Sequence, residues 1–274
     1  MANYRIETGT KDLLAELKDG IATLTLTRPD SKNAMTDEMN HALAAMLAQF
    51  ECDSKVRCIV LTGAGKAFCA GGDVKNMVAE GDHGSPETLD EEIHQLRTLQ
   101  RATTGKLFKM PKPTMAVLPG SAAGAGFSLA LACDLRIMST NAFLVTSFAR
   151  VGFPGDNGGT YFLTQLVGTA KARELYFLSD RIGAEEALSL GLTNWVVEPE
   201  ELEIKTKEIA SRLASGPPVA YRYMKENINR ALAGNIDDCM DLEATHMVHS
   251  GLTEDHKEGA RAFVEKREPV FKGR

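Results

Sequence analysis

Two segments rich in glycine and alanine constrain this chain more than any other feature. They are Gly65–Asp73 (GKAFCAGGD) and Gly120–Ser128 (GSAAGAGFS), and each follows a short apolar run and precedes a helical pattern. Glycine and alanine let a ligand approach the backbone closely because they carry little or no side chain. The first N–H groups of a helix also lack partners within that helix. Two such segments facing one point would offer two donors to a developing oxyanion, which predicts a reaction site.

Composition restricts the class of protein. The chain has 274 residues, of which 43% are hydrophobic and 25% charged, so it can bury a sizeable core. Its net charge of −6 and the lack of a long Lys/Arg run argue against a nucleic-acid partner. The N-terminal sequence has no apolar signal region, and Pro119 and several glycines interrupt the uncharged stretch 115–133, so we expect no membrane span. Five cysteines without CxxC spacing favour reduced thiols and a cytoplasmic location.

The hydrophobic periodicity predicts alternating strands and helices. Residues 21–27 alternate as in a half-buried strand, Thr36 is placed to cap a helix, and the apolar run 58–62 predicts a strand covered on both faces. Continued alternation predicts an α/β core with parallel strands. The polar stretch 81–91 predicts a loop, and the pattern beyond about residue 200 is wholly helical. We therefore expect a core at 1–200 and a helical region at 201–274.

Several ordered motifs resemble those of the crotonase family, also called the enoyl-CoA hydratase/isomerase family. The segments that carry the resemblance are GKAFCAGGDVKNM (65–77), PGSAAGAGFSLALACD (119–134), FARVGFPGDNGGTYFLTQLVG (148–168), AEEALSLGLTNWVV (184–197) and the C-terminal SGLTEDHKEGARAFVEKREPVFKG. They span nearly the whole chain. The resemblance implies a right-handed spiral of ββα units. It also implies a C-terminal helical region that packs between the subunits of a homotrimer or a dimer of trimers.

The resemblance implies an oxyanion hole made by the backbone N–H groups of Gly72 and Ala125. Because Ala125 opens a predicted helix, the helix dipole would add to its N–H. The family's hydratases carry two glutamates that hold and activate one water. A gap-free alignment places Ser128 and Phe148 at those two positions, and neither side chain can act as a general base. A standard hydratase mechanism is therefore disfavoured.

Asp156 matches a position where some isomerases of the family carry a functional aspartate. A carboxylate beside an enolate could remove a proton at one carbon of an acyl-CoA and return it at another. Burial would raise its pKa toward a useful range. The alternative is that Asp156 or Asn157 caps the helix predicted to begin near Gly158. We expect an enoyl-CoA double-bond isomerase that uses Asp156; the alternatives are a hydratase with a non-standard base and a non-catalytic CoA-binding relative.

The resemblance also implies contacts to coenzyme A, which enters as the thioester substrate and not as a resident cofactor. The first group comprises a nucleotide-contacting loop and backbone or apolar contacts to adenine and pantetheine. These residues are Lys32, Asn33, Ala34, Ala70, Asp73 and Val74. Phe263 and Lys266 match an aromatic residue and a lysine that reach CoA from the last helix of a neighbouring subunit. For these two residues an ordinary place on a helix surface is an equally good interpretation.

Two further patterns are interpreted as structural. Cys69 lies beside the predicted oxyanion hole, and we interpret it as a small apolar filler and not as a nucleophile. His246 and His249, with Glu243 on the same predicted helix, have a spacing that could hold a metal ion. Because no second cluster of ligands accompanies them, we interpret them as helix-surface residues and expect no metal site.

Overall fold

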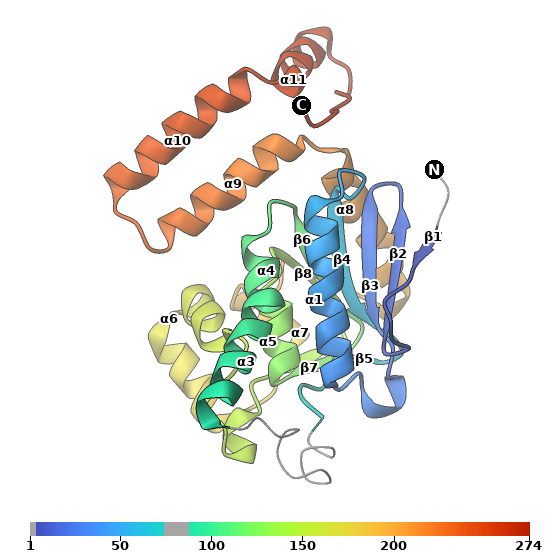
Figure 1. Cartoon of the computed structure of the whole chain (residues 1–274), viewed down its shortest axis with the longest axis vertical. Coiled ribbons are helices and arrows are strands. Elements are labelled where there is room, and N and C mark those ends of the chain that lie inside the picture. The colour runs from blue at the N-terminus through green and yellow to red at the C-terminus, as the bar shows by residue number, and fades with distance from the viewer. Residues whose placement is uncertain (1–3, 74–87) are drawn as a thin grey trace.

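The computed structural model describes residues 4–73 and 88–274, and Figure 1 shows their arrangement. The strands are β1 (Tyr4–Ile6), β2 (Leu13–Lys18), β3 (Ile21–Leu26), β4 (Cys58–Gly63), β5 (Ala67–Cys69), β6 (Thr114–Leu118), β7 (Ser121–Ala123), β8 (Leu135–Ser139), β9 (Phe143–Val145), β10 (Ile182–Gly183) and β11 (Trp195–Val197). The α-helices are α1 (Asp37–Cys52), α3 (Leu89–Ala102), α4 (Thr104–Lys109), α5 (Ala125–Leu131), α6 (Gly159–Leu178), α7 (Ala184–Ser189), α8 (Leu202–Ser215), α9 (Pro218–Ala231), α10 (Ile236–Gly251) and α11 (Glu254–Glu265).

Consecutive strands are divided between two sheets. The larger sheet has the order β1-β2-β3-β4-β6-β8-β11, and its strands are parallel from β3 onward. The smaller sheet has the order β10-β9-β7-β5, in which β5, β7 and β9 are parallel. The chain therefore passes from a strand of the larger sheet to a strand of the smaller one and then to a helix, as in β6-β7-α5 and β8-β9-α6. This repeated ββα unit and the parallel pairing confirm the predicted α/β fold.

The larger sheet is buried on both faces, as the apolar run of β4 predicted. Ile59 and Leu61 face the main core, to which α1 contributes its apolar stripe. Val60 points to the opposite face, where it packs with Ile209 of α8 in a second cluster. Thr36 caps α1 as predicted, because its side chain accepts a hydrogen bond from Met39 N.

Two local features refine the predicted elements. Helix α6, which was predicted to begin near Gly158, contains a kink at Gly168, whose φ of 76° lies in the left-handed region. The predicted loop 81–91 is wrong at its end, because α3 begins at Leu89. Thr88 and Glu91 form a reciprocal capping box there, a signal that the polar composition of the stretch concealed. Residues 81–87 lie outside the described residues.

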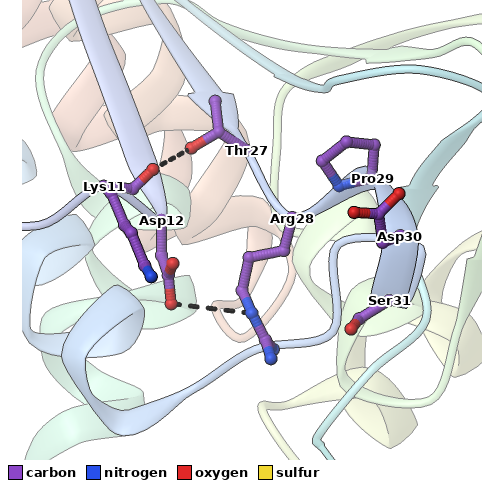
Figure 2. Close-up of a pocket in the computed structure, with 7 residues that line it drawn as sticks. All are labelled: Lys11, Asp12, Thr27, Arg28, Pro29, Asp30 and Ser31. Atoms are coloured by element: carbon purple, nitrogen blue, oxygen red, sulfur yellow. Dashed lines mark hydrogen bonds and ion pairs between the residues drawn. The ribbon is translucent and has the colours of Figure 1, made fainter.

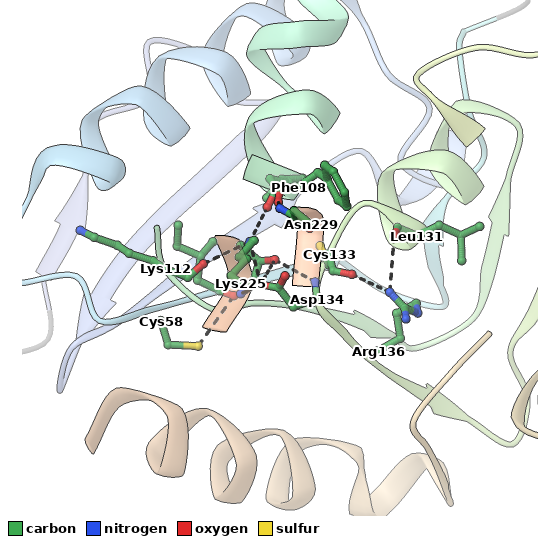
Figure 3. Close-up of polar contacts among 12 residues, drawn as sticks. Cys58, Phe108, Lys112, Leu131, Cys133, Asp134, Arg136, Lys225 and Asn229 are labelled. Atoms are coloured by element: carbon green, nitrogen blue, oxygen red, sulfur yellow. Dashed lines mark hydrogen bonds and ion pairs between the residues drawn. The ribbon is translucent and has the colours of Figure 1, made fainter. Parts of the chain in front are cut away.

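The C-terminal helices divide into two groups. Helix α8 covers the larger sheet, whereas α9, α10 and α11 extend away from it in Figure 1. Helix α9 is fastened to the body by Lys225, whose Nζ donates to Leu107 O and to Asp134 Oδ2, both at 2.8 Å (Figure 3). The division at residue 200 stays a prediction. Among the described helices, none combines the length and apolar character needed to cross a bilayer.

Candidate active site

The two glycine- and alanine-rich segments meet at one edge of the smaller sheet. Strands β5 and β7 run parallel with Ala67 opposite Ser121, so the segments that follow them emerge side by side. Gly71 has a φ of 95°, and a Cβ built on it would lie 2.9 Å from Ala123 O and 3.3 Å from Ala125 N. A side chain at this position would therefore separate the segments, which explains why glycine is required.

The two predicted oxyanion donors lie on these adjoining segments. Met35 N donates to Gly71 O at 2.8 Å and Asp73 N donates to Met35 O at 3.2 Å, which fixes the backbone on both sides of Gly72. Within the described part of the chain, neither Gly72 N nor Ala125 N donates a hydrogen bond to a protein atom. Two fixed N–H groups without protein acceptors are the arrangement that an oxyanion requires.

Cys69 packs beneath the junction of the segments. It is fully buried, and a Cβ built on Gly126 would lie 2.8 Å from its Sγ. Gly71 N donates to this sulfur at 3.4 Å, and burial raises the pKa of the Cys69 thiol to about 12. A thiol that stays protonated is a poor nucleophile, which agrees with the interpretation of Cys69 as a filler.

Asp156 lies in the turn before α6 and does not cap that helix through its side chain. Gly158 is the N-cap residue of α6, and no side chain caps it, so the capping alternative fails for Asp156 and Asn157. The Asp156 carboxylate instead accepts a hydrogen bond at Oδ1 from Gln100 Nε2 at 3.3 Å. Burial raises its pKa to about 6, in the direction expected.

Ser128 and Phe148, the residues aligned with the two hydratase glutamates, both adjoin the Asp156 turn. Ser128 Oγ donates to the backbone oxygen of Asp156 at 3.0 Å, which ties this turn to the helix that begins at Ala125. Phe148 stacks on Tyr176 with ring centroids 6.0 Å apart. Both Ser128 and Phe148 are buried, so the site replaces two acidic side chains with a hydroxyl and an aromatic ring.

The predicted nucleotide-contacting loop is closed by its own buried asparagine. Asn33 Nδ2 donates to Ala67 O at 2.8 Å and Asn33 Oδ1 accepts from Arg28 N at 2.9 Å. Its side chain therefore builds the loop and is not exposed to a ligand. Lys32 is exposed, and its carbonyl oxygen accepts from Ala70 N at 2.9 Å, so these two predicted CoA contacts are brought together.

Arg28 joins this loop to the first oxyanion segment. Its Nη1 donates to Ala34 O at 2.7 Å and to Asp73 Oδ2 at 2.8 Å, and its Nε lies 3.6 Å from Asp12 Oδ2. Asp73 is therefore held in an ion pair with Arg28.

A pocket of about 390 Å³ opens beside the loop (Figure 2). Its lining residues are Lys11, Asp12, Thr27, Arg28, Pro29, Asp30 and Ser31. Neither Arg28 nor this pocket was predicted from the sequence.

The remaining predicted CoA contacts are not gathered at this site. Val74 lies outside the described residues. Phe263 is 85% exposed near the end of α11, and Lys266 follows that helix. Figure 1 shows α11 at the top of the view, beyond α9 and α10, whereas α5 lies within the body, so these two residues are not beside the site of their own chain.

The histidines on α10 are engaged in a local contact. His246 Nδ1 lies 2.6 Å from Asn227 Oδ1, and the ring stacks on Tyr223 with centroids 4.0 Å apart. Among the described residues, no group of three histidine, cysteine or acidic side chains is arranged to bind a metal ion. His246 therefore joins α10 to α9 through its contacts with Asn227 and Tyr223.

Comparisons with known proteins agree with this geometry. The family model described as enoyl-CoA hydratase/isomerase matches residues 16–274. The chain is 36% identical to the 1,2-epoxyphenylacetyl-CoA isomerase of Escherichia coli, covering 96% of this chain and 98% of that protein. It is 38% identical to a probable enoyl-CoA hydratase of Rhodobacter capsulatus, over 94% of this chain and 97% of that one. A crystal structure of a putative enoyl-CoA hydratase from Streptomyces coelicolor superposes with a TM-score of 0.90 at 34% identity, covering 96% and 95% of the two chains. The chain therefore belongs to the enoyl-CoA hydratase/isomerase family of enzymes.

Proposed function

We propose that this enzyme is an enoyl-CoA double-bond isomerase in which Asp156 moves the proton. The Asp156 carboxylate would take a proton from the α carbon of a β,γ-unsaturated acyl-CoA. The negative charge then develops on the thioester oxygen, where the N–H groups of Gly72 and Ala125 stabilise it. The same carboxyl group returns the proton to the γ carbon, so the double bond moves into conjugation with the thioester and no atom is gained or lost.

The observation that carries this proposal is the burial of the Asp156 carboxyl group and the raised pKa that results. Burial raises its pKa to about 6, and its turn is tied through Ser128 to the helix that begins at Ala125. A base whose pKa lies near the working pH is efficient at both removing and returning a proton. The residues at the two hydratase glutamate positions, Ser128 and Phe148, leave Asp156 as the acidic group that supports acid–base chemistry here.

The test is an absorbance assay with matched 3-enoyl-CoA and 2-enoyl-CoA substrates. The wild-type enzyme is expected to form the conjugated thioester band from the 3-enoyl substrate. Asp156→Asn is expected to lower that rate by about 10²- to 10⁴-fold, the usual contribution of a general acid–base group. Asp180→Asn, at an exposed aspartate just beyond α6, is the matched control and should retain the wild-type rate.

The other outcomes identify the alternatives. Loss of the conjugated band from the 2-enoyl substrate, unchanged in Asp156→Asn, would indicate a hydratase with another base. The printed name of the Rhodobacter capsulatus relative is that of a hydratase, which is why this alternative is kept. Binding of acyl-CoA without turnover across a panel of acyl groups would indicate a non-catalytic CoA-binding protein.

We also propose that the protein is a homotrimer or a dimer of trimers that binds CoA thioesters without a resident cofactor. Support comes from large apolar side chains left exposed on the helices that extend from the body, including Ile228 at 64% and Met247 at 74%. A partner subunit would also bring Phe263 and Lys266 to the CoA site. A sedimentation mass equal to the 29.7 kDa monomer at micromolar concentration would contradict this assembly. The cytoplasmic location stays a prediction.

A further inference from the structure

One buried polar group beside Asp156 has no hydrogen-bond partner. The hydroxyl of Tyr176, on α6, is screened from solvent and bonds to none of the described residues. The Tyr176 residue is only 9% exposed, and its ring is held parallel to that of Phe148. A buried donor without an acceptor carries the full penalty of desolvation, so its presence requires an explanation.

The backbone around Asp156 is shaped to admit this hydroxyl. Gly155 directly precedes Asp156, and a Cβ built there would lie 3.1 Å from Tyr176 Cε1 and 3.5 Å from its hydroxyl. A Cβ built on Gly159, at the start of α6, would lie 2.8 Å from the same hydroxyl. Because both positions are glycine, the tyrosine hydroxyl can reach the turn that carries Asp156.

Asp156 offers a matching acceptor. Its Oδ1 accepts from Gln100, whereas no described residue donates to its Oδ2. Burial, and then the negative charge of Asp156, raise the pKa of Tyr176 above its ordinary value, so the two groups are within electrostatic reach. A phenol with a raised pKa stays protonated near neutral pH and can serve as a hydrogen-bond donor.

We propose that Tyr176 is a positioning residue whose hydroxyl donates a hydrogen bond to Oδ2 of Asp156 in the enzyme in solution, before substrate binds as well as during the reaction. The inference rests on the proposed role of Asp156 in proton transfer. Gln100 would hold one carboxylate oxygen and Tyr176 the other, which fixes the orientation of the carboxylate toward the substrate. The bond also stabilises the ionised carboxylate and therefore opposes the effect of burial.

The neighbours of Asp156 make this effect measurable. The polar side chains that contact its residue from neighbouring elements are Gln100 from α3, Ser128 from α5 and Tyr176 from α6. None of these three carries a charge at neutral pH. Burial is the cause of the raised pKa of Asp156 as long as the Tyr176 hydroxyl makes no bond to it. A change in the hydrogen bonding of this carboxyl group should therefore appear directly in its titration.

The first test is the titration of Asp156 itself. Infrared spectroscopy across a pH series reads the protonated carboxyl band, which is assigned to Asp156 by its loss in Asp156→Asn. Tyr176→Phe keeps the ring and its stacking on Phe148 and removes only the hydroxyl. It should raise the midpoint by about one pH unit, a tenfold change in the ionisation ratio. Tyr161→Phe, on the same helix at a residue that is 41% exposed, should leave the midpoint unchanged. An unchanged or lowered midpoint in Tyr176→Phe would overturn the proposal.

The second test uses the rate of isomerisation. In Tyr176→Phe the acid limb of kcat/KM should move upward by the same interval of about one pH unit, because the same carboxyl group titrates in both experiments. A purely structural role would instead lower the rate at every pH, which would also count against the proposal. The infrared titration needs no turnover. An inactive wild-type enzyme would thus reject the isomerase proposal and leave the titration to decide the role of Tyr176.

Discussion

The surroundings of Asp134 and of Asp156 show two opposite ways of holding an aspartate. Asp134 lies directly before β8, and its Oδ2 accepts from Thr114 N at 2.8 Å, from Thr114 Oγ1 at 2.9 Å and from Lys225 Nζ at 2.8 Å (Figure 3). Asp156 lies before α6, and among the described residues its carboxylate has one donor, Gln100, at 3.3 Å. One carboxylate receives three donors from its own fold at a single oxygen, one of them a cation, and the other receives a single neutral donor.

The difference separates a structural charge from a chemical one. The bonds to Asp134 join β6, β8 and α9, so they fasten the C-terminal helices to the body of the protein. Asp156 is buried without a cation to balance its charge in the described part of the chain, so its ionised form is disfavoured. Such an under-stabilised group is typical of a functional site.

The largest expected effect comes from breaking the Asp134 contact. Lys225→Met removes the cation, so Asp134 loses one donor and the carbonyl oxygen of Leu107 loses its bond to Lys225. Breaking a fully buried ion pair from one side costs about 3–5 kcal/mol. Because the Asp134 side chain is 29% exposed, the free energy of unfolding should fall by an amount near the lower end of that range. Urea unfolding at fixed protein concentration measures it. The acid limb of kcat/KM should not move.

The matched control is an exposed pair. Lys205 Nζ lies 2.9 Å from Glu208 Oε2 on the surface of α8. Lys205→Met should change the free energy of unfolding by less than about 1 kcal/mol, because water already solvates both charges. Equal losses in the two variants would show that Lys225 has no special role in fastening α9.

A smaller effect of opposite sign is expected at Asp156. Burial raises the pKa of its carboxyl group from 3.8 to about 6, so the folded state binds more protons than the unfolded state between these values. Stability attributable to this group therefore falls as pH rises through that window. Asp156→Asn should raise the free energy of unfolding at neutral pH by up to about 3 kcal/mol, and the gain should vanish below about pH 4.

The measurement is the difference in urea midpoint between wild type and Asp156→Asn across a pH series. Using the difference cancels the titration of all other groups. Loss of stability in the variant at neutral pH would mean that the ionised carboxylate has stabilising partners in solution. In that case Asp156 would resemble Asp134, and the contrast between the two regions would disappear.

The smallest expected changes in stability come from removing two hydroxyl groups, one beside each aspartate. Ser128→Ala removes the bond to Asp156 O, and Thr114→Val removes the bond from Oγ1 to Asp134 Oδ2. Each should lower the free energy of unfolding by about 1–2 kcal/mol, since each leaves a buried polar group with one partner fewer. The absorbance assay separates them: Ser128→Ala should slow isomerisation because the Asp156 turn loosens, and Thr114→Val should not. Equal rates in both variants would contradict a positioning role for Ser128.

The elements and the backbone of the site were accessible from local patterns. The alternation in β3, the cap at Thr36 and the apolar run of β4 each reflect burial and hydrogen bonding within a few residues. The meeting of the two glycine- and alanine-rich segments could also be predicted, because close backbone approach demands small residues wherever it occurs. The donor roles of Gly72 and Ala125 came from the family resemblance and stay predictions. The start of α3 was missed because a capping box in a polar stretch resembles a loop in composition.

The partners of the reactive carboxylate could not be predicted in this way. Gln100 and Asp156 are 56 positions apart, and Lys225 and Asp134 are 91 apart. Neither Gln100 nor Tyr176 stands in a motif that marks it, since a polar residue in a helix is usually solvated. Arg28, in the segment after β3, was missed because its bond to Asp73 spans 45 positions of the chain.

The sequence by itself therefore determined the family resemblance, the parallel α/β core and the residues whose small size allows the two segments to meet. These properties follow from side-chain volume and hydrophobic periodicity, which depend on residues that are close together in the sequence. The tertiary structure alone decided which aspartate is bonded and which is left with spare acceptor capacity. Burial and hydrogen bonding of a carboxylate depend on helices that return from distant parts of the chain, which neighbouring residues in the sequence do not specify.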